Sequence, residues 1–505
     1  MRISSIILCV RNANVSGHEQ RRQTDSPGKD EVNRMNDFRK TAQEMLEFIR
    51  ISPTCFHAVA NIGRMLEAAG FQQLQEKEEW KLEKGGRYYT ERNDSSVIAF
   101  AIPEKEAGIR GFHMAAAHSD SPCFKIKEKP ELTVEEHYLR LNTEKYGGMI
   151  LSTWLDRPLS VAGRLAVKNG NDIESRLVNI DQDLCVIPNV AIHMNREMNK
   201  GVEYNPQVDL LPLLADVTFD AHDAHEAYDA QTAYDAQTAY DAQIAYDAQI
   251  ASENTDEQSE KSEKPTLAAL AAEAAGVDVE TILGEDLFLY TRQEGKFLGA
   301  KGEFVLSPRL DDLQSAFALT KAFTESTPAE YINVCAVFDN EEVGSGTRQG
   351  ADSTFLEDIL QRIAEGLQAD HSSYLRWVAD SFLISADNAH AVHPNHPEKA
   401  DPTNRPYLNG GIVIKYHGSQ KYTTDGISAA RMKDYCERAK VPYQTYANRS
   451  DIAGGSTLGN ISTAHVSVSS VDIGLPQLAM HSAVETAGMM DTEYAVRALK
   501  EFWGE

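Results

Sequence analysis

Histidine and carboxylate side chains follow four apolar segments of strand length in this chain of 505 residues. The four pairs of segment and polar group are Gly111–Ala117 with His118-Ser119-Asp120, Ile332–Phe338 with Asp339-Asn340-Glu341-Glu342, Ser381–Ala386 with Asp387, and Val466–Gly474 with a loop carrying His481. Because ligands bind at the carboxyl ends of strands in open α/β sheets, we expect these groups to converge. Imidazole and carboxylate together predict a metal site.

A further carboxylate, Asp311, lies in the loop Ser307–Asp312, just before a predicted helix. With it the strand ends offer two imidazoles and at least three carboxylates, which suits two divalent ions of the zinc type with one bridging carboxylate. Two such ions about 3.5 to 4 Å apart can activate a water and polarise a carbonyl. The pattern therefore predicts hydrolysis of an amide or a phosphate ester.

The pair Glu341-Glu342 offers one ligand and one general base, and the residues alone do not say which is which. Asp120, two residues after His118 on an extended segment, is expected to accept the other ring proton of that histidine. Taken singly, each of these side chains is more often a turn former or a solvated loop residue. Their convergence at one sheet edge favours the metal site.

The elements that must position these groups form an α/β pattern. Two helices are predicted over 37–70, divided at Ser52-Pro53-Thr54, and strands alternate with helices of ten or more residues after Glu285. This alternation predicts a mostly parallel sheet flanked by helices. Between these parts, short alternating segments with Gly and Asn turns predict an inserted β-rich domain.

We therefore divide the chain into an extension, a catalytic domain in two pieces, and an insert. The predicted boundaries are 1–34 for a disordered or mis-started extension, 35–129 and 285–505 for the catalytic domain, and 130–284 for the insert. The folded part of the chain is expected to begin near Met35, and the start codon encodes either Met1 or Met35. A low-complexity stretch at about 220–264, which repeats AYDAQT and AYDAQI, is interpreted as a surface-loop insertion.

Composition excludes several classes of function. The chain has 49 basic and 76 acidic side chains, a net charge of −27, which argues against nucleic acid as a partner. No apolar run approaches the roughly 20 residues of a membrane span. The six cysteines are scattered without a CxxC pair, which favours a reducing compartment, and we expect a cytoplasmic protein.

Several longer motifs carry a family resemblance that runs from about Met35 to the C-terminus. They are HSDSP at 118–122, SPRLDD at 307–312, DNEEVGS at 339–345, SADNAHAVHPN at 385–395 and LAMHS at 478–482. In these motifs the chain resembles the aspartyl aminopeptidase family of dinuclear zinc exopeptidases. The resemblance implies two Zn²⁺, or similar ions such as Mn²⁺ or Co²⁺, with Asp311 bridging. The implied metal ligands are His118, Asp311, Glu342, Asp387 and His481.

The same resemblance assigns further roles. Glu341 becomes the general base and Asp120 the partner of His118, while Lys415 and Tyr422 match residues that bind the substrate. The β-rich insert is expected to make subunit contacts in a homo-oligomer, a dodecamer, with His193 reaching a neighbouring active site. The implied substrates are peptides with N-terminal Asp or Glu. Two alternatives stay open: a broad-specificity aminopeptidase preferring neutral residues, and a self-assembling shell or cargo protein with a vestigial site.

Overall fold

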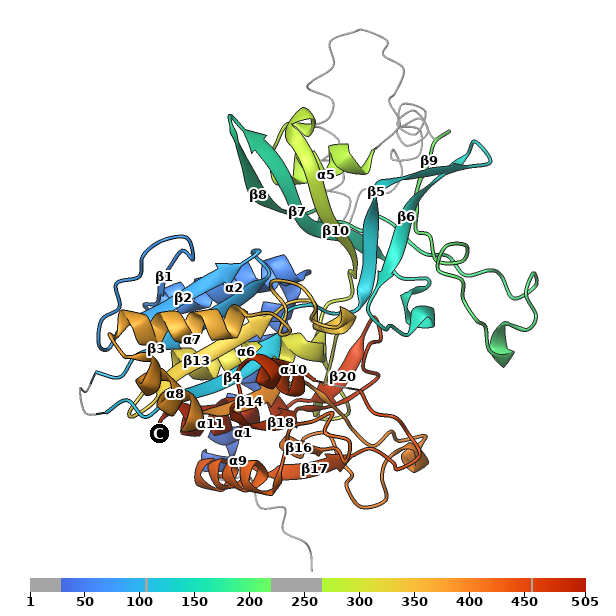
Figure 1. The fold of residues 1–505 in the computed structure, drawn as a ribbon. Helices are drawn as coiled ribbons and strands as arrows, with labels where there is room; N and C mark the ends of the chain where they lie inside the picture. The colour runs from blue at the N-terminus through green and yellow to red at the C-terminus, as the bar shows by residue number, and fades with distance from the viewer. Residues whose placement is uncertain (1–28, 105–107, 219–265, 456) are drawn as a thin grey trace, which may run out of the picture.

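The computed structural model describes residues 29–104, 108–218, 266–455 and 457–505. These residues form an α/β body around a nine-stranded sheet and, above it in Figure 1, a six-stranded sheet. A third sheet of five short strands supports the loops that leave the large sheet. The expected architecture, a mostly parallel sheet with helices and a β-rich part, is therefore confirmed.

The nine-stranded sheet has the order β1-β2-β3-β13-β4-β14-β18-β16-β17. Its strands are β1 Gln72–Gln73, β2 Arg87–Arg92, β3 Ser96–Ala101, β4 Phe112–His118, β13 Ile332–Phe338, β14 Phe382–Ala386, β16 Ile412–Tyr416, β17 Tyr443–Ala447 and β18 Ser469–Gly474. The central strands β13, β4, β14 and β18 are parallel neighbours. Their carboxyl ends therefore lie at one edge, where the predicted site residues follow them.

Helices cover both faces of this sheet. One face packs against α1 Lys29–Arg50, α2 Cys55–Ala68, α6 Leu310–Thr324, α9 Gly426–Ala439 and α11 Asp491–Trp503, and the other against α7 Phe355–Gly366, α8 His371–Ala379 and α10 Leu458–His465. Successive strand residues point to opposite faces, so Ala115 joins the first core and Met114 the second. Burial on both faces explains the continuous apolar runs of these strands.

The six-stranded sheet has the order β8-β7-β10-β5-β6-β9, and its neighbouring strands are antiparallel. Its strands are β5 Cys123–Val134, β6 Tyr138–Tyr146, β7 Leu159–Asn169, β8 Asp172–Asn179, β9 Leu213–Asp216 and β10 Ile282–Thr291. Helix α5 (Leu267–Ala275) contributes Leu267 and Ala271 to the separate core of this sheet. The side chain of Thr266 caps the start of α5, and Gly276, with φ of 65°, ends it.

The five-stranded sheet has the order β11-β12-β20-β19-β15, with β11 Lys296–Leu298, β12 Phe304–Ser307, β15 Ala389–His390, β19 Pro476–Leu478 and β20 Glu485–Gly488. The sequence pattern does not predict it. Strand β12 leads into Asp311, β15 follows Asp387, and β19 leads into His481. This small sheet therefore brings three distant ligand-bearing segments together.

Several predicted boundaries need correction. Strand β10, predicted as part of the α/β body, pairs instead with β5 and β7, so the limits 130 and 284 cut through β5 and β10. Both strands pair only within the six-stranded sheet, which a change in composition does not reveal. Helix α1 begins at Lys29, ahead of Met35. Residues 1–28 and the repeat at about 220–264 lie outside the described residues.

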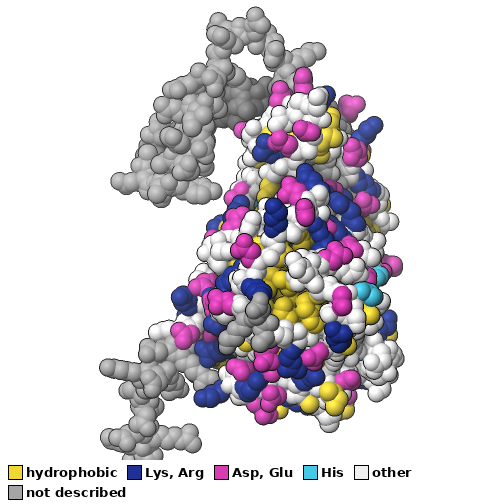
Figure 2. Space-filling view, turned by 60° about the vertical axis from the view of Figure 1, so that its left-hand side comes forward, with side chains coloured by type: hydrophobic (Ala, Val, Ile, Leu, Met, Phe, Trp, Pro, Cys, Tyr) yellow, Lys and Arg dark blue, Asp and Glu magenta, His cyan; other side chains and the backbone are white. Residues whose placement is uncertain are grey.

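The surface shows mixed charge. On the face drawn in Figure 2, basic and acidic side chains are interspersed around a hydrophobic area. Among the residues that the structure describes, no helix is long and apolar enough to cross a membrane.

Candidate metal centre

Three adjacent parallel strands supply the first part of the site. His118 ends β4, Asp387 follows β14, and Glu341 and Glu342 follow β13 in a short 3₁₀ turn, η4 (Glu341–Val343). Because these strands are neighbours in the order β13-β4-β14, their carboxyl ends present the four side chains to one space.

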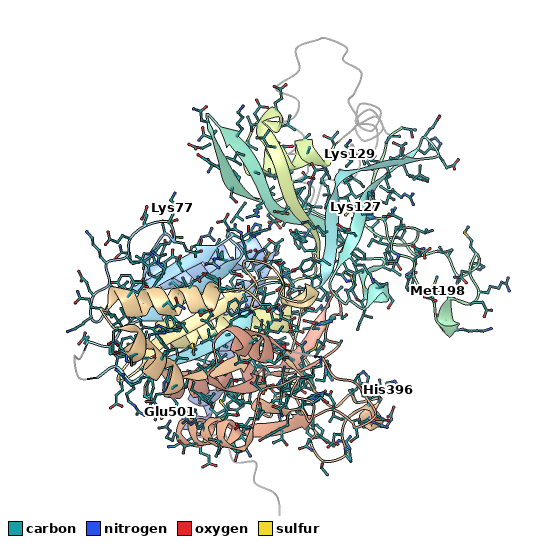
Figure 3. All side chains as sticks on the ribbon, viewed as in Figure 1. Lys77, Lys127, Lys129, Met198, His396 and Glu501 are labelled. Carbon is teal, nitrogen blue, oxygen red and sulfur yellow. The ribbon has the colours of Figure 1, made fainter. Side chains whose placement is uncertain are left out.

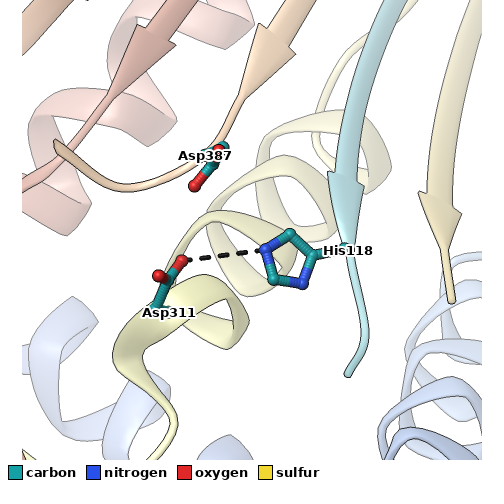
Figure 4. Close-up of side chains that lie close together, drawn as sticks. All are labelled: His118, Asp311 and Asp387. Atoms are coloured by element: carbon teal, nitrogen blue, oxygen red, sulfur yellow. Dashed lines mark ion pairs between the residues drawn. The ribbon is translucent and has the colours of Figure 1, made fainter. Parts of the chain in front are cut away.

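Asp311 joins His118 and Asp387 in one cluster. It lies in the first turn of α6, where its φ of −84° and ψ of 106° depart from helical values. The Oδ1 atom of Asp311 is 3.7 Å from Nε2 of His118 (Figure 4). One ligand-capable atom from each of these residues lies within 4.8 Å of the others, a spacing that suits one metal ion.

A second cluster shares Asp311. The Nε2 atom of His481 is 3.4 Å from Oδ2 of Asp311 and 3.4 Å from Oε1 of Glu342. One ligand-capable atom from each of these three residues also lies within 4.8 Å of the others. The two oxygens of Asp311 therefore face different clusters, which is the arrangement of a bridging carboxylate.

The donors fit divalent cations. Among the described residues, the buried atoms Asp311 Oδ1 and Glu342 Oε1 have no hydrogen-bond partner, an unfavourable state that a cation would relieve. Burial and the charge of Asp311 raise the pKa of Glu342 well above its ordinary value. Mixed imidazole and carboxylate ligands suit zinc and related ions.

Glu341 lies beside the clusters. One ligand-capable atom from each of Glu341, His118 and Glu342 lies within 4.8 Å of the others. Burial raises the pKa of Glu341 to about 7; His118 opposes this shift and Asp387 adds to it. Glu342 also joins the cluster with Asp311 and His481.

Asp120 organises the turn that carries both glutamates. Its Oδ1 accepts the backbone N–H of Glu341 at 3.1 Å, and its Oδ2 accepts that of Glu342 at 3.2 Å. The His118 ring atom Nδ1 is 3.0 Å from the backbone oxygen of Asp120 and 3.4 Å from its Oδ1. The carbonyl is thus the nearer acceptor for the ring proton, where the carboxylate was expected.

Glu485, on β20, is a site residue that sequence reasoning missed. Its carboxylate accepts the backbone N–H of Asp311 at 3.0 Å and that of His481 at 2.7 Å. It is buried, and burial together with the charge of Asp311 raises its pKa to about 8. The sequence feature that could have identified Glu485 is an acidic residue within the segment 483–488, whose other residues are small or apolar.

The predicted substrate residues lie at the same edge. The Lys415 side chain is 3% exposed, and its Nζ is 3.5 Å from Oδ2 of Asp387 and 5.3 Å from the ring centre of Tyr422. Burial alone would lower the pKa of Lys415, but the carboxylate of Asp387 raises it above its ordinary value. A cation therefore stands next to one of the metal clusters.

His193 does not join this group within one chain. It is exposed in the long loop between β8 and β9, which contains the 3₁₀ turn η2 (Met198–Lys200). Figure 3 shows this loop, with Met198 labelled, extending away from the rest of the molecule. A role for His193 in catalysis therefore requires another chain.

An α/β sheet whose carboxyl edge holds two candidate metal clusters with a shared aspartate fits the class of metallohydrolases. Comparison with known proteins gives the family. Residues 48–503 match the family model described as "Aminopeptidase I zinc metalloprotease (M18)". The chain is 45% identical over 466 residues to "Probable M18 family aminopeptidase 2" of Clostridium novyi, covering 92% of this chain and 98% of that protein. The chain belongs to the M18 family and is a zinc metallo-aminopeptidase, a peptide hydrolase.

Solved structures agree with this assignment. The chain superposes on a cryo-EM structure of the Ape4 and Nbr1 complex with a TM-score of 0.81 and 35% identity, covering 93% of this chain and 86% of that one. A structure of the yeast mApe1 dodecamer gives a TM-score of 0.74 and 25% identity, with 92% and 97% covered.

Proposed function

We propose that this M18 enzyme releases N-terminal Asp and Glu residues from peptides. The observation that carries the proposal is the buried Lys415 beside the metal clusters. An ammonium group in a low-dielectric site binds a carboxylate strongly, because the hydrogen bond is charge-assisted. The acidic balance of the whole chain does not oppose this, since salt screens charges beyond about 8 Å.

In this proposal, His118, Asp311 and Asp387 hold one ion, and Asp311, Glu342 and His481 hold the other. The ions, Zn²⁺ or a similar cation such as Mn²⁺ or Co²⁺, supply Lewis acidity toward the scissile carbonyl and the attacking water. The Glu341 carboxylate takes the proton of that water and delivers it to the leaving amine nitrogen. Asp120 keeps Glu341 in place through the backbone N–H of that residue.

Lys415 and Tyr422 form the proposed pocket for the acidic side chain. Tyr422 is buried and faces the ammonium group of Lys415 with its ring, so it restricts where that group can lie. Cation binding by Asp387 would engage the carboxylate that now pairs with Lys415, leaving ammonium donors for the substrate.

Release of amino acids from matched peptides beginning with Asp, Glu, Leu or Lys tests the proposal. Lys415→Met should lower release of Asp and Glu about 10- to 100-fold, the effect of losing a hydrogen bond between charged groups, and spare Leu. Lys421→Met, an exposed lysine next to Tyr422 in the chain, is the control. Faster release of Leu than of Asp by the unaltered enzyme would support broad specificity. No release by metal-loaded protein would favour the shell or cargo alternative.

We also propose that the chain forms a homo-oligomer, a dodecamer like the yeast mApe1 assembly. The loop between β8 and β9 supports this, because it carries several exposed apolar side chains. These are Val190, Ile192, Met194 and Val208. Exposed apolar groups gathered in one place mark interaction surfaces. His193 lies among them, in a position to reach a neighbouring chain.

A further inference from the structure

The end of β6, in the six-stranded sheet, touches the metal clusters of the nine-stranded body. We propose that the segment Tyr146-Gly147-Gly148, called here the 146–148 strap, is a positioning element for the cluster Asp311, Glu342 and His481. Through it, the β-rich part of the chain controls metal binding at that cluster. The inference rests on the proposed two-metal site and adds a role for residues that bind no metal themselves.

Gly148 fixes the ring of His481. The Nδ1 atom of His481 is 2.6 Å from the carbonyl oxygen of Gly148, and a carbonyl only accepts hydrogen bonds. Nδ1 therefore carries the ring proton, and Nε2, which faces Asp311 and Glu342, keeps its lone pair for a metal. The backbone N–H of Ile150 also donates to the carbonyl of His481, so the chain just beyond the strap holds its main chain too.

Gly147 lies directly against Glu342. Its φ is +79°, a conformation that favours glycine, and a Cβ atom there would lie 3.1 Å from Cβ of Glu342 and 3.4 Å from its carbonyl oxygen. The backbone of the strap thus approaches the ligand as closely as packing permits. A Cβ atom at this position would be too close to Glu342 unless that residue or the strap moved by a few tenths of an ångström.

Tyr146 acts on the turn that carries Glu342. Its hydroxyl donates to Oδ2 of Asp120 at 2.7 Å and accepts a hydrogen bond from Nδ2 of Asn340 at 2.8 Å. Asp120 in turn accepts the backbone N–H groups of Glu341 and Glu342. Tyr146 therefore orients the Glu341-Glu342 turn through Asp120.

The cluster of His118, Asp311 and Asp387 has other supports. The ring of His118 is held by the carbonyl of Asp120, and the backbone N–H of Asp387 donates to the carbonyl of Ile473 on β18. Tyr146 of the strap contacts the carboxylate of Asp120, whereas the His118 ring is bonded to the backbone carbonyl of that residue. A change in the strap should therefore weaken one metal site and spare the other.

The test is a zinc titration of metal-free protein against a chromophoric chelator, which reports the affinity of each site without an activity assay. Gly147→Ala should weaken one site about 10- to 100-fold, the usual effect of losing outer support for a ligand, and leave the other unchanged. Tyr146→Phe, which removes only the hydroxyl, should weaken the same site. Gly170→Ala is the control: Gly170 lies at the β7–β8 turn with φ of +62°, and a Cβ atom added there would have no neighbour within 4 Å.

Each result of the titration either supports or overturns the proposed role of the strap. Two sites of unaltered affinity in both strap variants, equal weakening of both sites, or the same loss in Gly170→Ala would overturn it while leaving the proposed function standing. Failure of the unaltered chain to bind two zinc ions would overturn the proposed function as well. If the melting temperature shows that Gly147→Ala does not fold, the Tyr146→Phe titration decides.

Discussion

At the scale of single residues, the two adjacent glutamates give a sharp test of the proposed chemistry. Glu342 contacts the His481 ring, whereas Glu341 is the proposed base. Glu341→Gln should retain both metal ions and lower kcat about 100- to 10,000-fold, because it removes proton transfer but no ligand. Metal content and peptide turnover, measured on the same sample, check this. Glu342→Gln, the matched variant, should instead lose metal; loss of metal in Glu341→Gln would reverse the two roles.

Residue types at strand ends were readable from the sequence, and the structure brings His118, Asp311, Glu342, Asp387 and His481 together. Glu485 was not readable in this way, because its partners are backbone N–H groups, one of them on Asp311, 174 residues away in the chain. Backbone contacts leave no motif of their own. A residue that orients ligands is therefore harder to predict than the ligands.

At the scale of elements, helix α2 packs on β2 with a partly buried carboxylate between them. Burial raises the pKa of Glu91 to about 7, and the charges of Asp94 and Glu67 add to this shift. The folded state thus binds more protons than the unfolded state between about pH 4.5 and 7, so stability falls as pH rises through that window and stays lower above it.

Glu91→Gln should therefore raise the melting temperature at pH 8 by about 2–4 °C, the effect of about 1 kcal/mol in a domain of 150 to 250 residues. At about pH 3 the variant and the unaltered chain should melt together, because Glu91 is then almost fully protonated in both the folded and the unfolded state. Calorimetry at the two pH values measures this. Glu78→Gln, at an exposed position, is the control. An equal gain at both pH values would contradict the role of the Glu91 charge.

Most elements of the α/β body followed from hydrophobic pattern, and β13 has the predicted bounds Ile332–Phe338. The five-stranded sheet did not, because its strands are two to four residues long and two of its pairings, β12 with β20 and β15 with β19, join distant parts of the sequence. Strands this short are not long enough to show a periodic pattern of hydrophobic residues. Their positions depend on the loops that they support.

At the scale of the whole molecule, the loop between β8 and β9 bears on whether a single chain is sufficient for activity or must assemble with others. Met194, which follows His193 in this loop, is 81% exposed. If the loop packs against another chain, Met194→Asp would place an unpaired charge in an apolar contact, and symmetry would repeat that cost at every copy of the interface. We expect this variant to have a smaller mass in solution by light scattering than the unaltered chain. Activity should fall with the mass, because His193 acts on a neighbouring site in this proposal.

Ile173→Asp is the matched control, since Ile173 is also exposed, at 65%, but lies on β8 at the edge of the same sheet. It should keep the mass and activity of the unaltered chain. A monomeric unaltered protein with full activity would contradict both the assembly and the role of His193. An unchanged mass in Met194→Asp would instead place the contact elsewhere. A variant that keeps its activity as a smaller species would separate the two ideas, because His193 would then not be needed by the site of another chain.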